Sequence, residues 1–190
     1  MRQIALLLSM VGLLVIAAGC ATYDSENAPD VVDDVDLERY TGTWYELASV
    51  PIRPQRGCVG TTARYELRDD GDIDVINTCY DESFDGDIRR ATGRAWLQDD
   101  GSDGRLWVRF FWPFRSHYWI IDLDEDYRWA VISGPDRDTL WVLSRSPCME
   151  QHRFEEIVDG LQARNFDVQS METTPQRGGN GDRCEVELRE

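Results

Sequence analysis

The sequence predicts an all-β fold, an eight-stranded up-and-down antiparallel barrel with one C-terminal α-helix packed outside it. The first sign is a succession of short segments, rich in aromatic and β-branched residues, in which apolar and polar side chains alternate. The second is that Gly, Pro and Asp residues separate these segments at short intervals, as in consecutive hairpins. The third is one later segment whose apolar residues recur at helical spacing instead.

Turn residues mark where each expected element begins and ends. The expected strands span residues 42–50, 59–67, 73–80, 90–97, 106–112, 118–123, 129–133 and 139–144. After Pro147, an amphipathic helix that packs on the barrel is predicted by Phe154, Ile157, Val158 and Leu161. A short ninth strand is expected at residues 166–171, and the Gly-rich tail beyond it is expected to be loose except at Cys184.

The length and composition allow one folded domain plus targeting material. The chain has 190 residues, of which 42% are hydrophobic and 11% aromatic, enough to build a core. Its 36 acidic residues outnumber 20 basic ones, all of them arginine, and the net charge is −16. Because nucleic acids and anionic lipids are bound through clustered cations, this balance disfavours a nucleic-acid partner and general electrostatic adhesion to a membrane.

An export signal precedes the domain. Residues 4–18 form an apolar run that is too short to span a bilayer but is typical of a secretory signal peptide. The run ends in Ala17-Ala18-Gly19-Cys20, which resembles the lipobox of bacterial lipoproteins, although alanine replaces the usual leucine at its first position. The alternative is an ordinary signal peptide followed by a chance cysteine.

The lipobox resemblance implies where the protein resides. It implies cleavage before Cys20, attachment of diacylglycerol to the sulfur of this residue and of a fatty acid such as palmitate to its nitrogen. By lipoprotein sorting rules, Ala21 rather than aspartate implies a lipid-anchored protein of the outer membrane, expected at the periplasmic face. The expected segments are a signal peptide (1–19), a lipidated cysteine with a flexible acidic tether (20–36), the barrel domain (37–171) and a polar C-terminal tail (172–190).

Export also decides how the other cysteines are interpreted. Cys58, Cys79, Cys148 and Cys184 remain after lipidation, and in an oxidising compartment they suggest two disulfides with three connectivities. The turn at residues 69–71 would let Cys58 and Cys79 face each other on a hairpin, which favours Cys58–Cys79 with Cys148–Cys184. The spacings contain no close pair of zinc ligands, so no metal site and no cofactor are expected.

Alternation within the strands indicates what lines the barrel. In residues 90–95 the small residues Ala91, Gly93 and Ala95 oppose Arg90, Thr92 and Arg94, and charged side chains belong in solvent. The inward series of all strands mixes such small residues with large aromatics. An eight-stranded barrel is near the size at which side chains fill the interior or leave room for one small ligand, and this mixture suggests room. The alternative is a fully packed core.

Three motifs in order resemble the lipocalin family. Gly42-Thr43-Trp44 resembles the first motif, residues 126–131 the second, and the segment Gly134 to Pro147, which carries Arg145, the third. The last is most similar to the bacterial outer-membrane lipocalins and less closely to apolipoprotein D. The resemblance covers residues 37–171 and implies that Gly42, Trp44 and Arg145 are structural and close one end of the barrel. It also implies a second disulfide scheme, in which Cys58 or Cys79 pairs with Cys184.

The same resemblance implies a ligand inside the barrel. We expect a single-chain amphiphile, a fatty acid or lysophospholipid, held for storage, transport or maintenance of the envelope under stress. The expected ligand-binding residues are Tyr65, Asn77, Phe110, Tyr118 and Trp141, of which all but Tyr65 are placed in the upper cavity near the open end. The mouth loops carry six arginines against six acids, whereas the turns at the other end are acidic, which favours entry of an anionic head group at the mouth.

Catalysis is not expected. The sequence contains no GxSxG, GxGxxG or P-loop motif, and no catalytic residues are assigned. Glu46 is expected to face inward in a hydrogen-bonded structural role rather than as an acid–base group. Two alternatives stay open, a lipocalin-fold enzyme acting on a lipid or isoprenoid and a structural envelope lipoprotein with a packed barrel. The sequence leaves the oligomeric state undecided.

Overall fold

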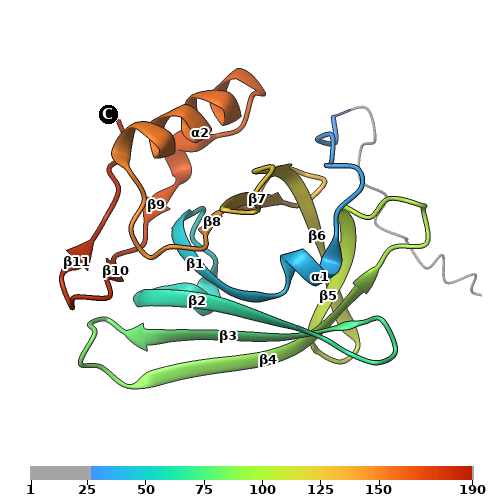
Figure 1. Ribbon diagram of the computed structural model, residues 1–190, viewed down its shortest axis with the longest axis horizontal. Helices are drawn as coiled ribbons and strands as arrows, with labels where there is room; N and C mark the ends of the chain where they lie inside the picture. Colours follow the sequence, from blue (N-terminus) through green and yellow to red (C-terminus); the bar gives the residue numbers. More distant parts are fainter. Residues whose placement is uncertain (1–26, 190) are drawn as a thin grey trace, which may run out of the picture.

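The computed structural model describes residues 27–189, which form the predicted eight-stranded antiparallel barrel (Figure 1). The signal peptide and Cys20 lie outside the described residues. Each strand pairs with the next, and β1 pairs with both β8 and β2, which closes the barrel. The strands are β1 (Gly42–Ser49), β2 (Cys58–Leu67), β3 (Ile73–Asp81), β4 (Ile88–Leu97), β5 (Arg105–Phe111), β6 (Phe114–Leu123), β7 (Trp129–Ser133) and β8 (Leu140–Ser144).

The up-and-down order gives the barrel two distinct ends. The connections β2–β3, β4–β5 and β6–β7 lie at one end, together with the start of β1 and the end of β8, and we call this end the floor. The other connections, β1–β2, β3–β4, β5–β6 and β7–β8, lie at the mouth. A one-turn helix, α1 (Leu37–Tyr40), precedes β1 and is capped by the Asp36 carboxylate, which accepts from the backbone of Glu38 and Arg39.

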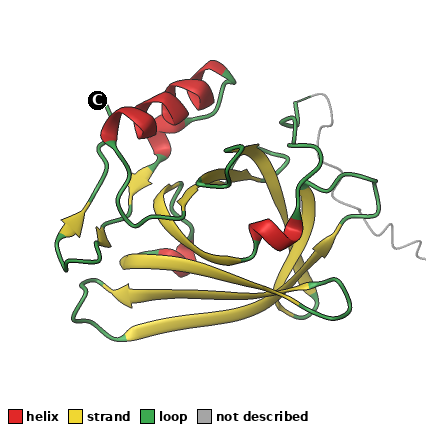
Figure 2. Cartoon of the chain, in the orientation of Figure 1, coloured by secondary structure: helices red, strands yellow, loops and turns green. Residues whose placement is uncertain are grey.

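The predicted helix is confirmed as α2 (Gln151–Ala163), which lies outside the barrel (Figure 2). Its side chains Phe154, Ile157 and Leu161 are buried. They pack in an apolar layer with outward-facing barrel residues such as Trp119 and Val142, whereas a separate cluster fills the barrel interior. The molecule therefore has one core inside the barrel and another between the barrel and α2.

The C-terminal segment differs from the prediction. Residues 166–171 are not a strand: a 3₁₀ turn (Val168–Ser170) occupies this stretch, and the short strand β9 (Glu172–Thr173) follows it. Nor is the tail loose, because Gln176 is fully buried and Val186 packs under α2; β10 (Gln176–Arg177) and β11 (Arg183–Cys184) form a two-stranded ribbon.

The seam between β1 and β2 is paired over only part of its length, and this explains why the tail is ordered. The register between β1 and β2 runs only from Gly42 to Tyr45, and toward the mouth β1 pairs with β9 instead. The side-chain amide of Gln176 donates to the backbone carbonyls of Glu46 at 2.7 Å and Thr61 at 3.0 Å, one on each side of the seam. The tail thus supplies hydrogen bonds that β1 and β2 do not make to each other.

The chain before α1 is also packed. The backbone N–H of Val32 donates to the carbonyl of Ile120 on β6 at 2.9 Å, and Val35 is buried. A Cβ on Gly104 would lie 2.3 Å from the Val32 carbonyl oxygen, so glycine is required for this close approach. The described part of the stretch expected to be a flexible tether, residues 27–36, is therefore packed against the barrel.

Both disulfides follow the favoured pairing. Cys58 bonds to Cys79 with the Cα atoms 5.5 Å apart, and Cys148 bonds to Cys184 with the Cα atoms 5.2 Å apart. The first joins the mouth ends of β2 and β3, and the second ties the tail to the segment before α2. The scheme implied by the family, with Cys58 or Cys79 joined to Cys184, is wrong for this chain because Cys148 occupies the position beside Cys184.

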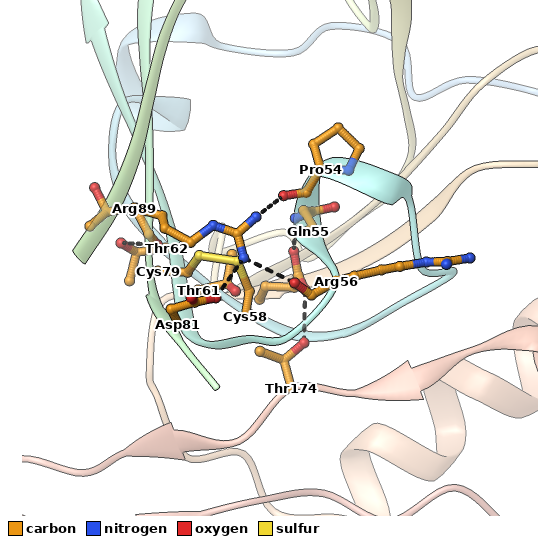
Figure 3. The surroundings of a disulfide bond; sticks show 12 residues. Pro54, Gln55, Arg56, Cys58, Thr61, Thr62, Cys79, Asp81, Arg89 and Thr174 are labelled. Carbon is orange, nitrogen blue, oxygen red and sulfur yellow. Dashed lines mark hydrogen bonds and ion pairs between the residues drawn. A yellow bond between two sulfur atoms is a disulfide. The ribbon is translucent and has the colours of Figure 1, made fainter. Parts of the chain in front are cut away.

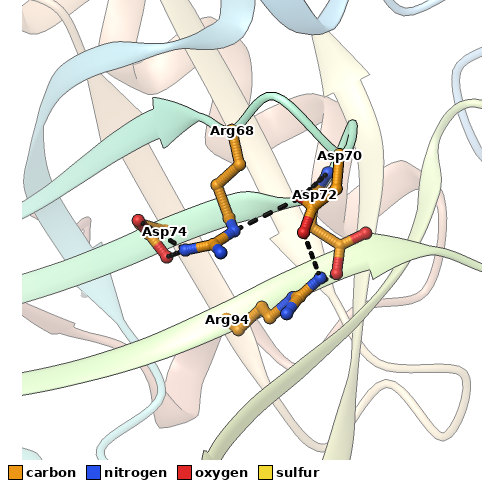
Figure 4. Close-up of polar contacts among 5 residues, drawn as sticks. All are labelled: Arg68, Asp70, Asp72, Asp74 and Arg94. Carbon is orange, nitrogen blue, oxygen red and sulfur yellow. Dashed lines mark hydrogen bonds and ion pairs between the residues drawn. The ribbon is translucent and has the colours of Figure 1, made fainter.

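Two arginines form ion pairs with aspartates of the acidic turn between β2 and β3 at the floor. Arg68 forms ion pairs with Asp70 and Asp74, and Arg94 on β4 forms ion pairs with Asp70 and Asp72 (Figure 4). These pairs are largely exposed, so each contributes little to stability, but together they engage Asp70, Asp72 and Asp74. Within residues 27–189, no helix is both long enough and apolar enough to cross a membrane.

Candidate ligand-binding site

The interior of the barrel is closed at the floor and accessible at the mouth. Among the inward-facing residues, those of the floor half are buried: Trp44, Tyr65, Ile73, Val75, Ala95, Leu106 and Val108. Those nearer the mouth are partly or fully exposed: Ala63, Asn77, Ala91, Phe110 and Trp141. The inward-facing side chains thus run from buried at the floor to partly exposed and mostly apolar at the mouth, and we call this inner surface the cup.

Trp44 and Arg145 close the floor, as the family resemblance implied. The indole of Trp44 is fully buried, and the Arg145 guanidinium stacks on it with its central carbon 3.8 Å from the ring centroid. Arg145 also donates to the carbonyls of Arg39 at 2.7 Å and Thr43 at 3.1 Å. The guanidinium therefore joins the chain before β1 to the end of β8.

Three tyrosine hydroxyls meet directly above this floor. The hydroxyl of Tyr118 lies 2.8 Å from that of Tyr40 and 2.9 Å from that of Tyr65. Burial raises the pKa of Tyr65 to about 12 and raises the pKa of Tyr40 and of Tyr118 well above the ordinary value, so all three are neutral at physiological pH. The base of the cup is thus polar but uncharged.

The sequence prediction placed Tyr118 wrongly in the upper cavity. It assumed that the strand begins at Tyr118, whereas β6 begins at Phe114, so Tyr118 lies midway along β6. Its hydroxyl reaches down to Tyr65, whose register partner is Gly42 at the floor end of β1. Tyr65 and Tyr118 therefore form the base of the cup.

Trp141 lies near the mouth, as predicted, and faces the interior. It is the second residue of β8 and packs against the interior cluster. Its indole N–H donates to the Gln55 side chain at 3.1 Å. Gln55 belongs to a short 3₁₀ turn (Arg53–Gln55) in the β1–β2 connection, so this contact joins the wall of the cup to a loop at its rim.

Glu46 is buried beneath this loop and has the structural role that was expected. Its carboxylate accepts hydrogen bonds from Gln55 at 2.7 Å, Thr174 at 2.7 Å and Ser49 at 3.1 Å. Burial raises the pKa of the Glu46 carboxyl, and the three hydrogen bonds oppose that shift without cancelling it. A carboxyl held on both oxygens connects three separate parts of the chain and leaves no free base.

Replacing Glu46 with glutamine is expected to flatten the pH dependence of stability. Because the folded-state pKa lies above the ordinary value of 4.5, the contribution of Glu46 to stability is fully present below pH 4.5. It is lost as the pH rises through the folded-state pKa. The free energy of unfolding of the wild type relative to Glu46→Gln should therefore fall from acidic to neutral pH, measured by urea denaturation.

Glu125→Gln, at an exposed position in the β6–β7 turn, controls for the removal of one negative charge. A stability difference between wild type and Glu46→Gln that stays constant or grows with pH would contradict the assignment of a raised pKa to Glu46.

Asn77 and Phe110 lie on the wall of the cup, as predicted. The side-chain oxygen of Asn77 is buried and accepts no hydrogen bond from the described residues. The Phe110 ring packs on Gly93, where a Cβ would lie 2.8 Å from a ring carbon, so glycine at this position makes space for the aromatic ring. The wall therefore contains one buried amide oxygen that has no hydrogen-bond partner among the described residues.

Arg89 holds the rim of the mouth together; the sequence placed it among the arginines of the mouth loops but did not predict this role. Its guanidinium donates to the carbonyls of Pro54 and of Arg56, the latter at 2.9 Å, and to the Asp81 carboxylate at 3.1 Å (Figure 3). Because Arg89 shares its strand parity with Ala91 and Gly93, alternation alone would have placed it on the inner face. The assumption that charged residues face outward concealed it.

Tyr40 and Gln55 were also missed. Neither belongs to an alternating segment, since Tyr40 lies in the turn before β1 and Gln55 in a loop. The sequence carries no pattern that would have identified either one.

Two hollows of the described surface lie outside the barrel. One, of about 430 Å³, is an open area on the outer wall between Asp74, Arg94 and Arg109. The other, of about 240 Å³, lies between β1 and the tail near Cys148 and Cys184. Neither includes a predicted ligand-binding residue, and the first is bordered by side chains that the floor ion pairs already engage.

Comparison with known proteins matches the sequence motifs and the barrel. The model of a family described as "Lipocalin-like domain" matches residues 35–176. Outer membrane lipoprotein Blc of Citrobacter freundii is 36% identical over 178 residues, which cover 94% of this chain and 99% of that protein. The Escherichia coli K12 protein of the same name is 37% identical, covering 88% and 94% respectively.

More distant similarities agree with these. Apolipoprotein D of Bos taurus is 29% identical, with 90% of this chain and 93% of that protein covered. Insecticyanin from the tobacco hornworm Manduca sexta superimposes with a TM-score of 0.63 at 20% identity, over 84% of this chain and 89% of that structure. At this identity the superposition supports the fold alone.

Proposed function

We propose that this chain, which belongs to the lipocalin family, binds a single-chain amphiphile, a fatty acid or lysophospholipid, in the mouth half of its barrel. The observation that carries the proposal is the gradient of exposure along the interior, from a sealed floor to an accessible and mostly apolar mouth. Small-molecule sites have this character, an apolar recess with a few polar groups that fix orientation.

The proposed contacts follow from the position of each side chain. Phe110 and Trp141 would pack along the acyl chain, and Asn77 would supply a polar side chain beside it. Tyr65 and Tyr118 would limit how deeply the chain can enter, because their hydroxyls are already paired with each other. A carboxylate or phosphate would remain at the mouth, where the rim carries Arg89 and other arginines.

The proposed site of action is the outer membrane. Two of the relatives are named outer membrane lipoproteins, and this chain carries its own lipobox-like sequence before Cys20. Acylation of Cys20 would anchor the protein, since several acyl chains give stable attachment where one is marginal. Storage or transport of a lipid for maintenance of the envelope under stress is consistent with such an anchor.

Two other functions have less support. An enzyme that uses the interior would need a free acid–base group, and the carboxylate of Glu46 is engaged by three donors. A structural lipoprotein with a packed barrel would bury Trp141 and Phe110, which instead remain partly exposed. Mass spectrometry of lipids that co-purify with the full chain separates the three: a bound amphiphile supports binding, a converted lipid supports catalysis and an empty barrel supports the packed core.

Replacing Trp141 with alanine is expected to weaken binding of a fluorescent fatty-acid probe by about tenfold or more. Losing the burial of a large aromatic side chain removes about 1.5–3 kcal/mol, and each 1.4 kcal/mol corresponds to about tenfold in affinity. Titration of the probe into wild type and variant measures the change. Trp141→Phe separates the ring contact from the hydrogen bond to Gln55.

Trp96→Ala is the matched control, because Trp96 lies on the outer face of β4. If a folded Trp141→Ala variant bound the probe as tightly as the wild type, Trp141 would lie outside the binding site.

A further inference from the structure

The tip of the β5–β6 hairpin carries three large aromatic side chains that contact little of the protein. Phe111, Trp112 and Phe114 are 76%, 83% and 76% exposed, and we call residues 111–114 the aromatic tip. Among the described residues, the next most exposed large hydrophobic side chain is Ile88 at 62%, which also lies at the mouth, at the start of β4. Clustered exposure of this kind marks an interaction surface, whereas single exposed residues do not.

The hairpin is also free of negative charge. Residues 105–121 contain no Asp or Glu and three arginines, in a chain of 190 residues with 36 acids. Arg115, next to the tip, stacks on Trp107, with its guanidinium carbon 3.8 Å from the ring centroid. The guanidinium carbon of Arg109 lies 5.2 Å from the ring centroid of Trp96. A lipid surface with phosphate groups would therefore meet no repulsion at this part of an otherwise acidic protein.

The chain enters the described structure at the same end of the barrel. The carbonyl of Asn27 accepts a hydrogen bond of 2.8 Å from Arg137, which lies in the β7–β8 connection at the mouth. Cys20 precedes Asn27 by seven residues (27 − 20). Seven residues span at most about 25 Å, so an acyl anchor on Cys20 would keep the side of the barrel that carries Arg137 within that distance of the membrane.

We infer that the aromatic tip docks on a lipid surface, with Phe111, Trp112 and Phe114 in the boundary between head groups and acyl chains and the mouth of the barrel facing the membrane. Tryptophan and phenylalanine favour this boundary, and the neighbouring arginines reach phosphate oxygens. The anchor and the tip then form two points of attachment beside the opening. An amphiphile can pass between bilayer and barrel without crossing open water. The orientation rests on the proposed acylation of Cys20; the insertion of the tip is tested independently of the proposed ligand.

The first test measures whether Trp112 enters the bilayer. The full lipidated chain is reconstituted in phosphatidylcholine vesicles whose acyl chains carry bromine, which quenches tryptophan fluorescence on contact. We expect quenching of the wild type that is reduced in Trp112→Phe, since phenylalanine keeps the tip apolar but removes the reporter. Trp96→Phe, on the outer wall away from the tip, should retain the wild-type quenching. Equal quenching of wild type and Trp112→Phe would overturn the proposal.

The second test uses the combined variant Phe111→Ser/Trp112→Ser/Phe114→Ser, with Cys20 intact. It should stay on vesicles through its anchor and bind a fluorescent fatty acid supplied in solution as tightly as the wild type, yet take the same probe from vesicles severalfold more slowly. Unchanged transfer from vesicles would overturn the proposal. A second result would also overturn it: the wild type is a dimer, the variant is a monomer, and bromolipids do not quench the wild type. In that case a second copy of the chain, and not a membrane, would cover the tip. If no probe bound to either protein, the proposed function would fail, and the quenching result alone would decide the docking.

Discussion

Replacing Trp44 with alanine is expected to lower the free energy of unfolding by about 3–5 kcal/mol, the usual cost of emptying a buried aromatic site. Trp44 is fully buried, its indole N–H donates to the Tyr40 carbonyl at 2.8 Å, and the Arg145 guanidinium stacks on its ring. Alanine would leave a cavity at the floor and would remove the surface on which Arg145 rests. Urea denaturation of wild type and variant, with both disulfides intact, measures the loss.

Trp112→Ala is the matched control, because it removes the same side chain from a position that is 83% exposed. Its free energy of unfolding should stay within about 0.5 kcal/mol of the wild type, as for most surface substitutions. A Trp44→Ala variant as stable as Trp112→Ala would show that the floor motif does not hold the barrel together.

The strands and the floor were predictable because their information is local. Each strand alternates over five to ten residues, and alternation fixes both the strand and the face that is buried. Trp44 and Arg145 could be assigned to one end as soon as the strand order was known, since the first strand begins where the eighth ends. The Cys58–Cys79 pairing followed from the same hairpin geometry and is confirmed.

The tail could not be predicted in the same way, because its order depends on a gap elsewhere in the fold. Residues 172–176 have no strand-like pattern, and they become ordered because β1 and β2 separate toward the mouth. Gln176 is a polar residue whose burial is compensated by the hydrogen bonds that its side-chain amide donates to two backbone carbonyls, one on β1 and one on β2. No pattern within residues 172–176 indicates that β1 and β2 separate toward the mouth.

Which of the candidate residues face inward was predicted better than how deep each one lies in the barrel. Trp141, Phe110 and Asn77 lie on the wall as expected, because parity decides which face they occupy. Tyr118 was placed too high because the hairpin turn at Trp112 and Pro113 lets β6 start earlier than its apolar alternation suggests. The depth of a side chain in a barrel depends on the stagger between strands, which sequence alternation does not contain.

Replacing Cys20 with serine is expected to remove the protein from the outer membrane. Serine cannot form the thioether to diacylglycerol, so neither lipid attachment nor the cleavage that follows it should occur. Without acyl chains, each worth about 0.8 kcal/mol per buried CH₂, no covalent anchor remains. Fractionation after a salt wash, with mass spectrometry of the intact chain to detect acylation and cleavage, measures the change. Ala21→Ser, which keeps the cysteine, should remain acylated and in the outer membrane.

The aromatic tip makes the outcome of this experiment more informative, because it offers a second and weaker attachment. If Phe111, Trp112 and Phe114 enter the bilayer, a fraction of the Cys20→Ser protein should stay on the membrane after a salt wash. A urea wash should remove this fraction. Adding serine at all three positions should release that remainder, since one insertion point alone gives marginal binding. If the variant with all four substitutions still fractionated with the outer membrane after a salt wash, the lipid anchor on Cys20 would not be what holds this chain there.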